Sequence, residues 1–189
     1  RRIKSLVFST DVAIIKNINA DAIIAVYPFT PQPAITQAII GVSEVPVFCG
    51  VGGGLTNGVR SASMAAYVEH QGAYGVVCNS KIGVETIHAI KDAVEIPVVY
   101  TVISENTDIQ PYLTAGVDII NVSGAARTPE IVGALRQRYP ELPIIATGGP
   151  TEESILATIR AGANAITYTP PSSASLFAKT MADNRSELE

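Results

Sequence analysis

Two pairs of residues near the end of the chain have the types and spacing that could bind an anion. Gly148 and Gly149 follow one short apolar stretch, and Ser172 and Ser173 follow the next one. Glycines let the backbone approach a bound group closely, and free backbone N–H groups beside serine hydroxyls suit a phosphate. We therefore expect a phosphate-binding loop here; the alternative is a tight turn between a strand and a helix.

Lys81 and Glu105 are the side chains that could react with a substrate. Lys81 ends an apolar stretch, where a desolvated lysine can form a Schiff base or hold a phosphate; a solvated lysine at a helix start is the alternative. Glu105 is the best-placed carboxylate for acid–base chemistry, unless it only caps a helix. His70 and His88 fall within predicted helices. No group of His, Asp, Glu or Cys residues has the spacing of metal ligands, and no Ser-His-Asp arrangement is evident, so we expect no metal and no cofactor.

Other glycine and polar residues follow the same apolar stretches. A run of three glycines near residue 53 is either a ligand-facing loop or a structural turn, and it lacks the Lys-Ser/Thr of a P-loop. Arg127 either clamps an anion or lies on the surface. We expect the following residues to bind the substrate: Tyr27, Gly52, Gly53, Asn57, Asn79, Asn121, Ser123, Arg127 and Thr147.

Short, continuous apolar stretches alternate with helical patterns along the chain, as in a parallel sheet covered by helices. The predicted strands are Ala22–Tyr27, Val47–Val51, Gly75–Asn79, Val98–Val102, Ile119–Val122, Ile144–Thr147 and Ala165–Tyr168. The predicted helices are Pro33–Val42, Ser61–Gln71, Gly83–Val94, Thr107–Ala115, Thr128–Tyr139, Thr151–Ala161 and a tail helix at Ala174–Asn184.

An internal repeat indicates how these elements close on themselves. Proline and glycine mark alternate strand starts: Pro46, Gly72, Pro97, Gly116, Pro143 and Gly162. The two-strand unit recurs every 45 to 50 residues or so, and four such units make a (β/α)8 TIM barrel. We therefore expect a single compact barrel over residues 1–189. The first strand is either Ile3–Ser9, followed by a helix at Asp11–Ile18, or it is irregular or missing.

Composition narrows the class of protein. The net charge of −4 argues against a nucleic-acid surface, and no apolar run approaches the 18 residues or so of a transmembrane helix. The N-terminus lacks the features of a signal peptide, so we expect a cytoplasmic protein whose Cys49 and Cys78 are buried free thiols. The helix Pro33–Val42 carries little charge, which favours a homo-oligomer.

The stretch IIATGGPTEESILATIRAGANAITYTPPS resembles the phosphate-binding TIM barrels. Two further stretches, STDVAIIKNINADAIIAVYPFTPQ and VPVFCGVGGGLTNG, look closest to small uncharacterised bacterial barrels with a generic hydrolase label. YGVVCNSKIG, together with the Thr-Gly-Gly region, is more distantly similar to the glycerol-uptake operon antiterminator regulators. The 2-keto-3-deoxy-6-phosphogluconate aldolases end similarly, but their Schiff-base lysine lies on strand 6, where this chain has Asn121-Val122-Ser123.

These observations predict a barrel that binds a small phosphorylated metabolite at the C-terminal ends of its strands, where the active sites of such barrels lie. The first hypothesis is an enzyme of lyase, isomerase or hydrolase type acting on a sugar-phosphate-like substrate. The second is a non-catalytic regulator that senses the metabolite. A strongly shifted pKa of Lys81 or Glu105, with the side chain facing the site, would favour the enzyme. A rim on which no titratable side chains converge would favour the sensor.

Overall fold

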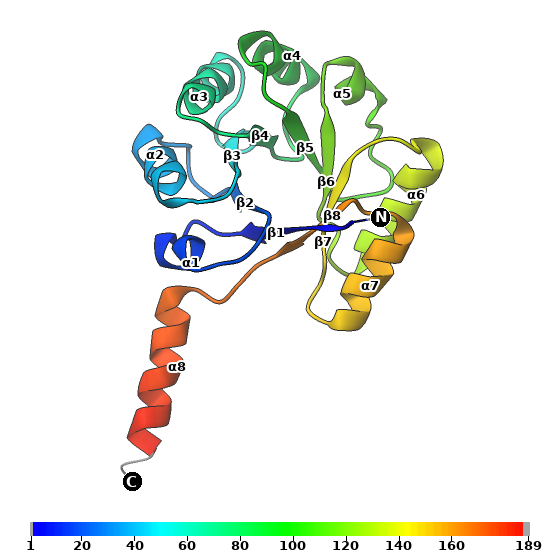
Figure 1. Cartoon of the computed structure of the whole chain (residues 1–189). Helices are drawn as coiled ribbons and strands as arrows, with labels where there is room; N and C mark the ends of the chain where they lie inside the picture. Colours follow the sequence, from blue (N-terminus) through cyan, green and yellow to red (C-terminus); the bar gives the residue numbers. More distant parts are fainter. Residues whose placement is uncertain (1, 187–189) are drawn as a thin grey trace.

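Eight parallel strands close into a barrel, and helices surround it (Figure 1). The structure, a computed structural model, describes residues 2–186. The strands are β1 (Lys4–Phe8), β2 (Ala22–Ala25), β3 (Val47–Gly52), β4 (Gly75–Cys78), β5 (Val98–Val102), β6 (Ile119–Val122), β7 (Ile144–Thr147) and β8 (Ala165–Tyr168). β1 pairs with both β2 and β8, so the predicted (β/α)8 barrel is confirmed.

The helices alternate with the strands. They are α1 (Val12–Lys16), α2 (Pro33–Val42), α3 (Val59–His70), α4 (Val84–Ala93), α5 (Gln110–Thr114), α6 (Thr128–Arg138), α7 (Glu152–Ala161) and α8 (Ser173–Ser186), with a 3₁₀ turn, η1 (Ala125–Arg127), before α6. α5 is shorter than predicted, because Ser104 to Ile109 form a loop before it. Pro111 lies in the first turn of the helix, where a missing N–H is tolerated. His70 and His88 lie on the outer helices with exposed side chains.

The first unit is complete. β1 is a strand, and Asp11 caps the short helix α1 by accepting hydrogen bonds from the backbone N–H groups of Ala13 and Ile14. The strand was difficult to recognise because only Leu6 and Val7 of its five residues are buried. The first of the two alternatives drawn from the sequence is therefore correct.

Side-chain contacts account for the internal repeat. In three of the four units, the residue that precedes the second strand accepts a hydrogen bond from a backbone N–H at the start of the first strand. The pairs are Asp21 with Ser5 at 2.9 Å, Asp118 with Val98 at 2.8 Å, and Asn164 with Ile144 at 3.0 Å. These contacts satisfy strand N–H groups at the N-terminal end of the barrel and fix the offset between neighbouring strands.

Two apolar layers fill the molecule. The interior of the barrel contains Leu6, Ala22, Ile24, Phe48, Val77, Val99, Ile145 and Ala165. A larger cluster lies between the sheet and the helices, and it includes the free thiols of Cys49 and Cys78, which are buried as predicted. Burial raises the pKa of both thiols to about 12, so they stay protonated at neutral pH.

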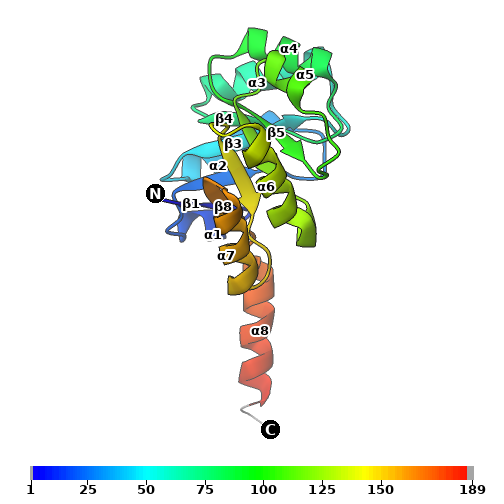
Figure 2. The same ribbon diagram turned by 90° about the vertical axis from the view of Figure 1, so that its right-hand side faces the viewer.

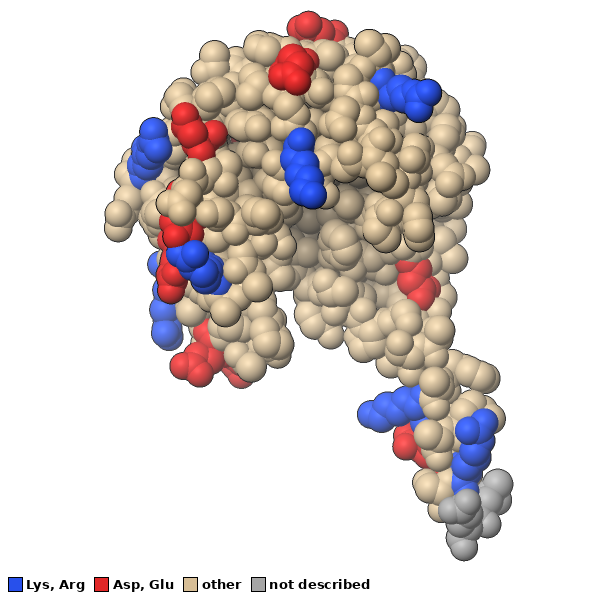
Figure 3. All heavy atoms as spheres, turned by 180° about the vertical axis from the view of Figure 1, so that it is seen from behind, with Lys and Arg blue, Asp and Glu red and all other residues tan. Residues whose placement is uncertain are grey.

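α8 stands apart from this arrangement. It projects away from the barrel in both ribbon views, and none of its residues is buried (Figures 1 and 2). On the face seen in Figure 3, acidic and basic side chains are few and interspersed, without the basic patch that nucleic acid would require. Within the described residues, no helix is long and apolar enough to cross a membrane.

Candidate functional site at the barrel mouth

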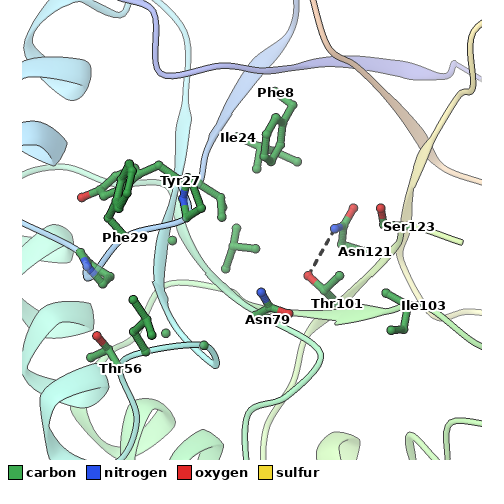
Figure 4. A pocket seen from close by; sticks show the side chains of 18 residues that line it. Phe8, Ile24, Tyr27, Phe29, Thr56, Asn79, Thr101, Ile103, Asn121 and Ser123 are labelled. Atoms are coloured by element: carbon green, nitrogen blue, oxygen red, sulfur yellow. Dashed lines mark hydrogen bonds between the residues drawn. The ribbon is translucent and has the colours of Figure 1, made fainter. Parts of the chain in front are cut away.

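A cavity of about 370 Å³ opens at the C-terminal ends of β1 to β6 (Figure 4). One wall is polar and comes from β4, β5 and β6, together with the residues that follow them. The other wall is apolar and comes from β1, β2 and the loop after β2. This is the end of the barrel at which the active sites of (β/α)8 enzymes lie.

The polar wall consists of Asn79, Thr101, Asn121 and Ser123. Side chains alternate along a strand, so residues two positions beyond the interior Val77, Val99 and Ile119 point into the barrel again, at its mouth. In Figure 4 these four side chains lie side by side around the same space.

Two hydrogen bonds orient the amides of this wall. Asn121 Nδ2 donates to Thr101 Oγ1 at 3.3 Å, and Ser80 Oγ donates to Asn79 Oδ1 at 3.1 Å. An amide nitrogen carries two hydrogens, so Asn121 keeps one further donor and Asn79 keeps both. The wall therefore offers several neutral hydrogen-bond donors to a bound group.

The apolar wall contains Phe8, Ile24 and Val26, and it continues into Tyr27 and Phe29. Phe29 is 67% exposed at the rim. The Tyr27 hydroxyl accepts a hydrogen bond from the Gln32 backbone N–H at 2.8 Å, which ties the loop after β2 to the start of α2. A ligand in the cavity would contact apolar groups on one side and polar groups on the other.

The glycine run after β3 borders the cavity. Gly53 has a positive φ of 95°, and a Cβ there would lie 2.7 Å from the Asn79 carbonyl oxygen. The Gly53 N–H donates to the Thr56 carbonyl at 2.9 Å, which closes the loop on itself. Glycine is therefore required at this position for the loop to pass close to β4. Gly52 and Gly54 line the cavity, whereas the exposed Asn57 donates to the Gly54 carbonyl at 3.2 Å.

Glu105 and Arg127 form an ion pair above the ends of β5 and β6. The Arg127 guanidinium donates to the Glu105 carboxylate, and it also lies 3.4 Å from a Glu130 carboxylate oxygen. The backbone N–H of Glu105 and the Arg127 guanidinium lower the pKa of the Glu105 carboxyl, and Glu105 in turn raises the pKa of Arg127. Glu105 is therefore an ionised carboxylate held near the rim, and neither residue lines the cavity.

Lys81 lies in the turn between β4 and α4, with an exposed side chain. It follows the cavity residue Asn79 by two positions, but it is not among the residues that line the cavity. Its reactive role stays a prediction.

The ends of β7 and β8 hold the predicted phosphate loop. Gly149 has a positive φ of 82°, and the loop leads into a capping box in which Thr151 and Ser154 each accept a backbone hydrogen bond. Thr147 is half-buried beside Thr167, whose hydroxyl is buried without a hydrogen-bond partner.

The serines of this region already form hydrogen bonds within the protein. Ser172 Oγ lies 2.8 Å from Ser175 Oγ. Asp11 Oδ2 accepts hydrogen bonds from the Ser173 backbone N–H at 2.7 Å and from its hydroxyl at 2.6 Å. A phosphate on Ser173 would have to displace a carboxylate, so the phosphate-binding role of Gly148, Gly149, Ser172 and Ser173 stays a prediction.

Of the residues expected to bind a substrate, the structure brings five together around this cavity: Tyr27, Gly52, Asn79, Asn121 and Ser123. Sequence reasoning missed the other residues that line the same cavity, among them Phe8, Thr101 and Ile103. Thr101 could have been found, because it lies two positions beyond an interior valine and opposite Asn121 in the sheet register.

The side chains that line the cavity include no carboxylate, which is the ligand that Mg²⁺ most often takes from proteins. Across the described part of the chain, no group of three or more His, Cys, Asp or Glu residues could hold a metal ion. The side chains that line the cavity therefore do not fit a metal site made of protein ligands.

No protein-family model matches the chain, and no curated protein matches it in sequence. Solved structures match it closely in fold. A 2,3-dimethylmalate lyase, described as a PEP mutase/isocitrate lyase superfamily member, is 15% identical with a TM-score of 0.75, over 98% of this chain and 82% of that one.

Two further structures match nearly as well. The phosphoenolpyruvate phosphomutase of Streptomyces platensis subsp. rosaceus is 16% identical, with a TM-score of 0.72 over 98% of this chain and 81% of that one. A phosphonopyruvate hydrolase, solved with oxalate and Mg²⁺, is 16% identical, with a TM-score of 0.72 over 97% of this chain and 80% of that one. At this identity the likeness establishes a (β/α)8 barrel. The similarity to the uncharacterised barrels and to the antiterminator regulators stays a prediction.

Proposed function

We propose that the protein is an enzyme of lyase, isomerase or hydrolase type that acts on a small phosphorylated metabolite bound at the barrel mouth. The proposal rests on one observation above all. Amide and hydroxyl groups from three neighbouring strands converge on a single cavity at the catalytic end of a (β/α)8 barrel.

The chemistry of the cavity suits an oxyanion with an apolar portion. Asn79, Asn121 and Ser123 can donate hydrogen bonds to phosphate or carboxylate oxygens, while Phe8 and Ile24 contact carbon atoms. Hydrogen bonds to a charged acceptor are about twice as strong as those between neutral groups. The volume of about 370 Å³ lies within the range of small-molecule sites.

The structural neighbours support the same class of substrate. Their names refer to phosphoenolpyruvate, phosphonopyruvate and dimethylmalate, all of them small anions, and to lyase, mutase and hydrolase activities. This chain shares their fold, and it offers a donor-rich cavity at the corresponding end of the barrel.

Arg127 and Glu105 would complete the site in this proposal. Arg127 binds the anionic group of the substrate, and the Glu105 carboxylate, released from the ion pair, accepts a proton from the substrate. A glutamate carboxyl is ionised at neutral pH, as a base requires, and the backbone N–H of Glu105 lowers its pKa further even without the ion pair. Lys81 would steer the anion toward the mouth from its exposed position.

A non-catalytic sensor of the same metabolite is the alternative, and one observation favours it. Tyr27 is the only residue with a titratable side chain among those that line the cavity, and its hydroxyl already accepts a hydrogen bond. A sensor needs binding groups but no acid or base within reach of the ligand.

The test combines thermal unfolding with ³¹P NMR. Inorganic phosphate, phosphoenolpyruvate, phosphonopyruvate and glycerol 3-phosphate are added separately to the wild type and to Lys81→Ala. A ligand at 100 times its dissociation constant stabilises the fold by about 2.7 kcal/mol, an easily measured shift in Tm. We expect at least one phosphorylated compound to stabilise the protein and to change its ³¹P spectrum over time.

Two other outcomes are informative. Stabilisation without any chemical change in the ligand over hours would support the sensor and contradict the enzyme. The absence of any shift with these four compounds would contradict both functions.

A further inference from the structure

The loop between β3 and α3 presents consecutive backbone N–H groups at the barrel mouth. Gly54, Leu55 and Thr56 of this loop line the cavity. Within the described part of the chain, the N–H groups of these three residues and of Asn57 donate no hydrogen bond. Successive N–H groups of a glycine-rich loop are donors that an anion can use.

The loop leads into the N-terminus of α3, a helix of 12 residues. Its N-cap is Gly58, which has no side chain to cap the first turn, and the Gly58 N–H donates to Thr86 Oγ1 at 3.1 Å. The first backbone N–H groups of a helix have no acceptor within it and carry partial positive charge. The first turn of α3 contains no acidic residue and includes Arg60, so its charge favours an anion.

Two hydroxyl groups at this junction have no hydrogen-bond partner within the described residues. Ser61, in the first turn of α3, is fully buried, and its hydroxyl faces the loop, since a Cβ on Gly52 would overlap it. Thr56 is only 6% exposed and lines the mouth, and its hydroxyl has no partner among the same residues. Buried polar groups are as a rule paired with protein, water or ligand atoms. Two unpaired hydroxyls beside this helix N-terminus therefore indicate that a ligand oxygen binds here.

Asn79 and Arg60 extend this set of donors on either side. Gly53 packs on the Asn79 backbone, which places the Asn79 amide, with both of its hydrogens available, beside the loop (Figure 4). Arg60 lines an adjoining cavity of about 340 Å³ that shares Thr56 and Pro31 with the mouth. None of the ion pairs among the described residues involves Arg60. Its guanidinium is therefore available to attract an anion.

The loops after β7 and β8 offer less to an anion. Asp11 already accepts hydrogen bonds from Ser173 there. α7 begins with Glu152 and Glu153, which would repel a negative group at its N-terminus. By contrast, residues 52–68 include no acidic side chain.

We propose that residues 54–57 and the first turn of α3 bind an oxyanion of the ligand, a phosphate or carboxylate group. The backbone N–H groups, the Thr56 hydroxyl and the Asn79 amide donate to its oxygens, and Arg60 adds positive charge nearby. Arg127 follows β6, three strands from β3 around the barrel, and holds other oxygens of the same ligand. This inference rests on the proposed function, because it assigns the anionic group of that ligand to one side of the mouth.

NMR of the backbone amides locates the site, with inorganic phosphate and acetate as probes. Inorganic phosphate should shift the ¹⁵N–¹H resonances of Gly54 and Leu55 saturably and leave those of Gly149 and Ser173 nearly unchanged. Larger shifts of Gly54 and Leu55 with acetate than with phosphate would support the site and identify the group as a carboxylate. Shifts confined to Gly149 and Ser173, or no shift with either ion, would overturn the inference.

Two variants separate this inference from the proposed function. Thr56→Val removes the hydroxyl and keeps the shape of the side chain, and Arg160→Gln on α7 is the charge-matched control for Arg60→Gln. For the phosphorylated compound that gives the largest thermal shift, Thr56→Val should bind about tenfold more weakly, because it loses a hydrogen bond to a charged group. Arg60→Gln should also bind more weakly, with a smaller dependence on salt, and Arg160→Gln should bind like the wild type.

The two failures are distinguishable. Wild-type affinity in both Thr56→Val and Arg60→Gln would overturn the inference and leave the proposed function standing. If the wild type binds none of the phosphorylated compounds, the proposed function is contradicted, whatever the two ions do at Gly54 and Leu55.

Discussion

The Arg127 guanidinium donates a hydrogen bond to the Glu105 carboxylate, and this contact joins the loop after β5 to the turn η1 after β6. The two residues are 22 positions apart in the sequence and come together because β5 and β6 are neighbours in the barrel. Together with the backbone N–H of Glu105, this pairing lowers the pKa of the Glu105 carboxyl.

The first prediction concerns that ionisation. The pKa of Glu105 is lowered first by its own backbone N–H and then by Arg127. Arg127→Gln should therefore raise the Glu105 pKa toward its ordinary range without restoring it fully. A ¹³C NMR titration of the Glu105 carboxyl measures this change, and Arg160→Gln on the outer helix α7 is the control. An identical Glu105 titration in wild type and Arg127→Gln would contradict the ion pair.

The second prediction concerns two adjacent glycines. Gly53→Ala should lower the free energy of unfolding by more than about 1 kcal/mol, because alanine is strained at a φ of 95° and its Cβ would overlap the Asn79 backbone. Gly54→Ala is the matched control, since its Cβ would enter open space. Urea unfolding of both variants checks this. Equal effects at the two positions would show that the loop does not pack on β4 as described.

The third prediction concerns the pH dependence of stability. The Ser5 backbone N–H and Lys4 lower the pKa of Asp21 from 3.8 to about 2. A lowered pKa in the folded state means that the stabilisation is complete above pH 3.8 and is lost as the pH falls through about 2.

Urea unfolding of wild type and Asp21→Asn at pH 7, 4 and 2 measures this loss. The wild type should be the more stable protein at pH 7, and the difference should shrink between pH 4 and pH 2. Asp92→Asn, an exposed substitution on α4, is the control. A difference between wild type and Asp21→Asn that is constant over the whole range would contradict the assignment.

The fourth prediction concerns the two cysteines. Burial raises the pKa of Cys49 and Cys78 to about 12, and a thiol reacts through its thiolate. The native protein should therefore react very slowly with 5,5′-dithiobis(2-nitrobenzoate) at pH 8, and should release two equivalents in urea. Rapid reaction of either thiol in the native state would place it at the surface.

The fold could be predicted from the sequence because each strand is a short apolar run with a helical pattern on either side. The limits of β5 to β8 agree with the prediction, since most residues of Val98 to Val102 and of the three later runs are buried, although Tyr168 at the end of β8 is exposed. β1 was ambiguous because Lys4 and Ser5 are exposed and are paired with Asp21. Such pairing depends on the alignment of β1 with β2, and no local pattern reveals it.

The site could be predicted only in part. Strand ends identified Asn79 and Asn121, because a polar residue two positions beyond an interior apolar residue faces the mouth. The same rule could not show that Lys81 lies in an exposed turn, since a turn has no fixed alternation. The contact between Asp11 and Ser173 spans 162 positions and follows only from the meeting of β1 and β8.

The most direct test of the central claim is the affinity of the barrel mouth for a phosphorylated ligand. Isothermal titration with the compound that gives the largest thermal shift compares wild type, Asn79→Ala, Asn121→Ala and the outer-helix control Gln37→Ala. Loss of a hydrogen bond to a charged group costs about 1.5–3 kcal/mol, so we expect affinity to fall by about tenfold or more in both asparagine variants. Gln37→Ala should bind like the wild type. Unchanged affinity in both Asn79→Ala and Asn121→Ala would contradict the proposal that this cavity is the binding site.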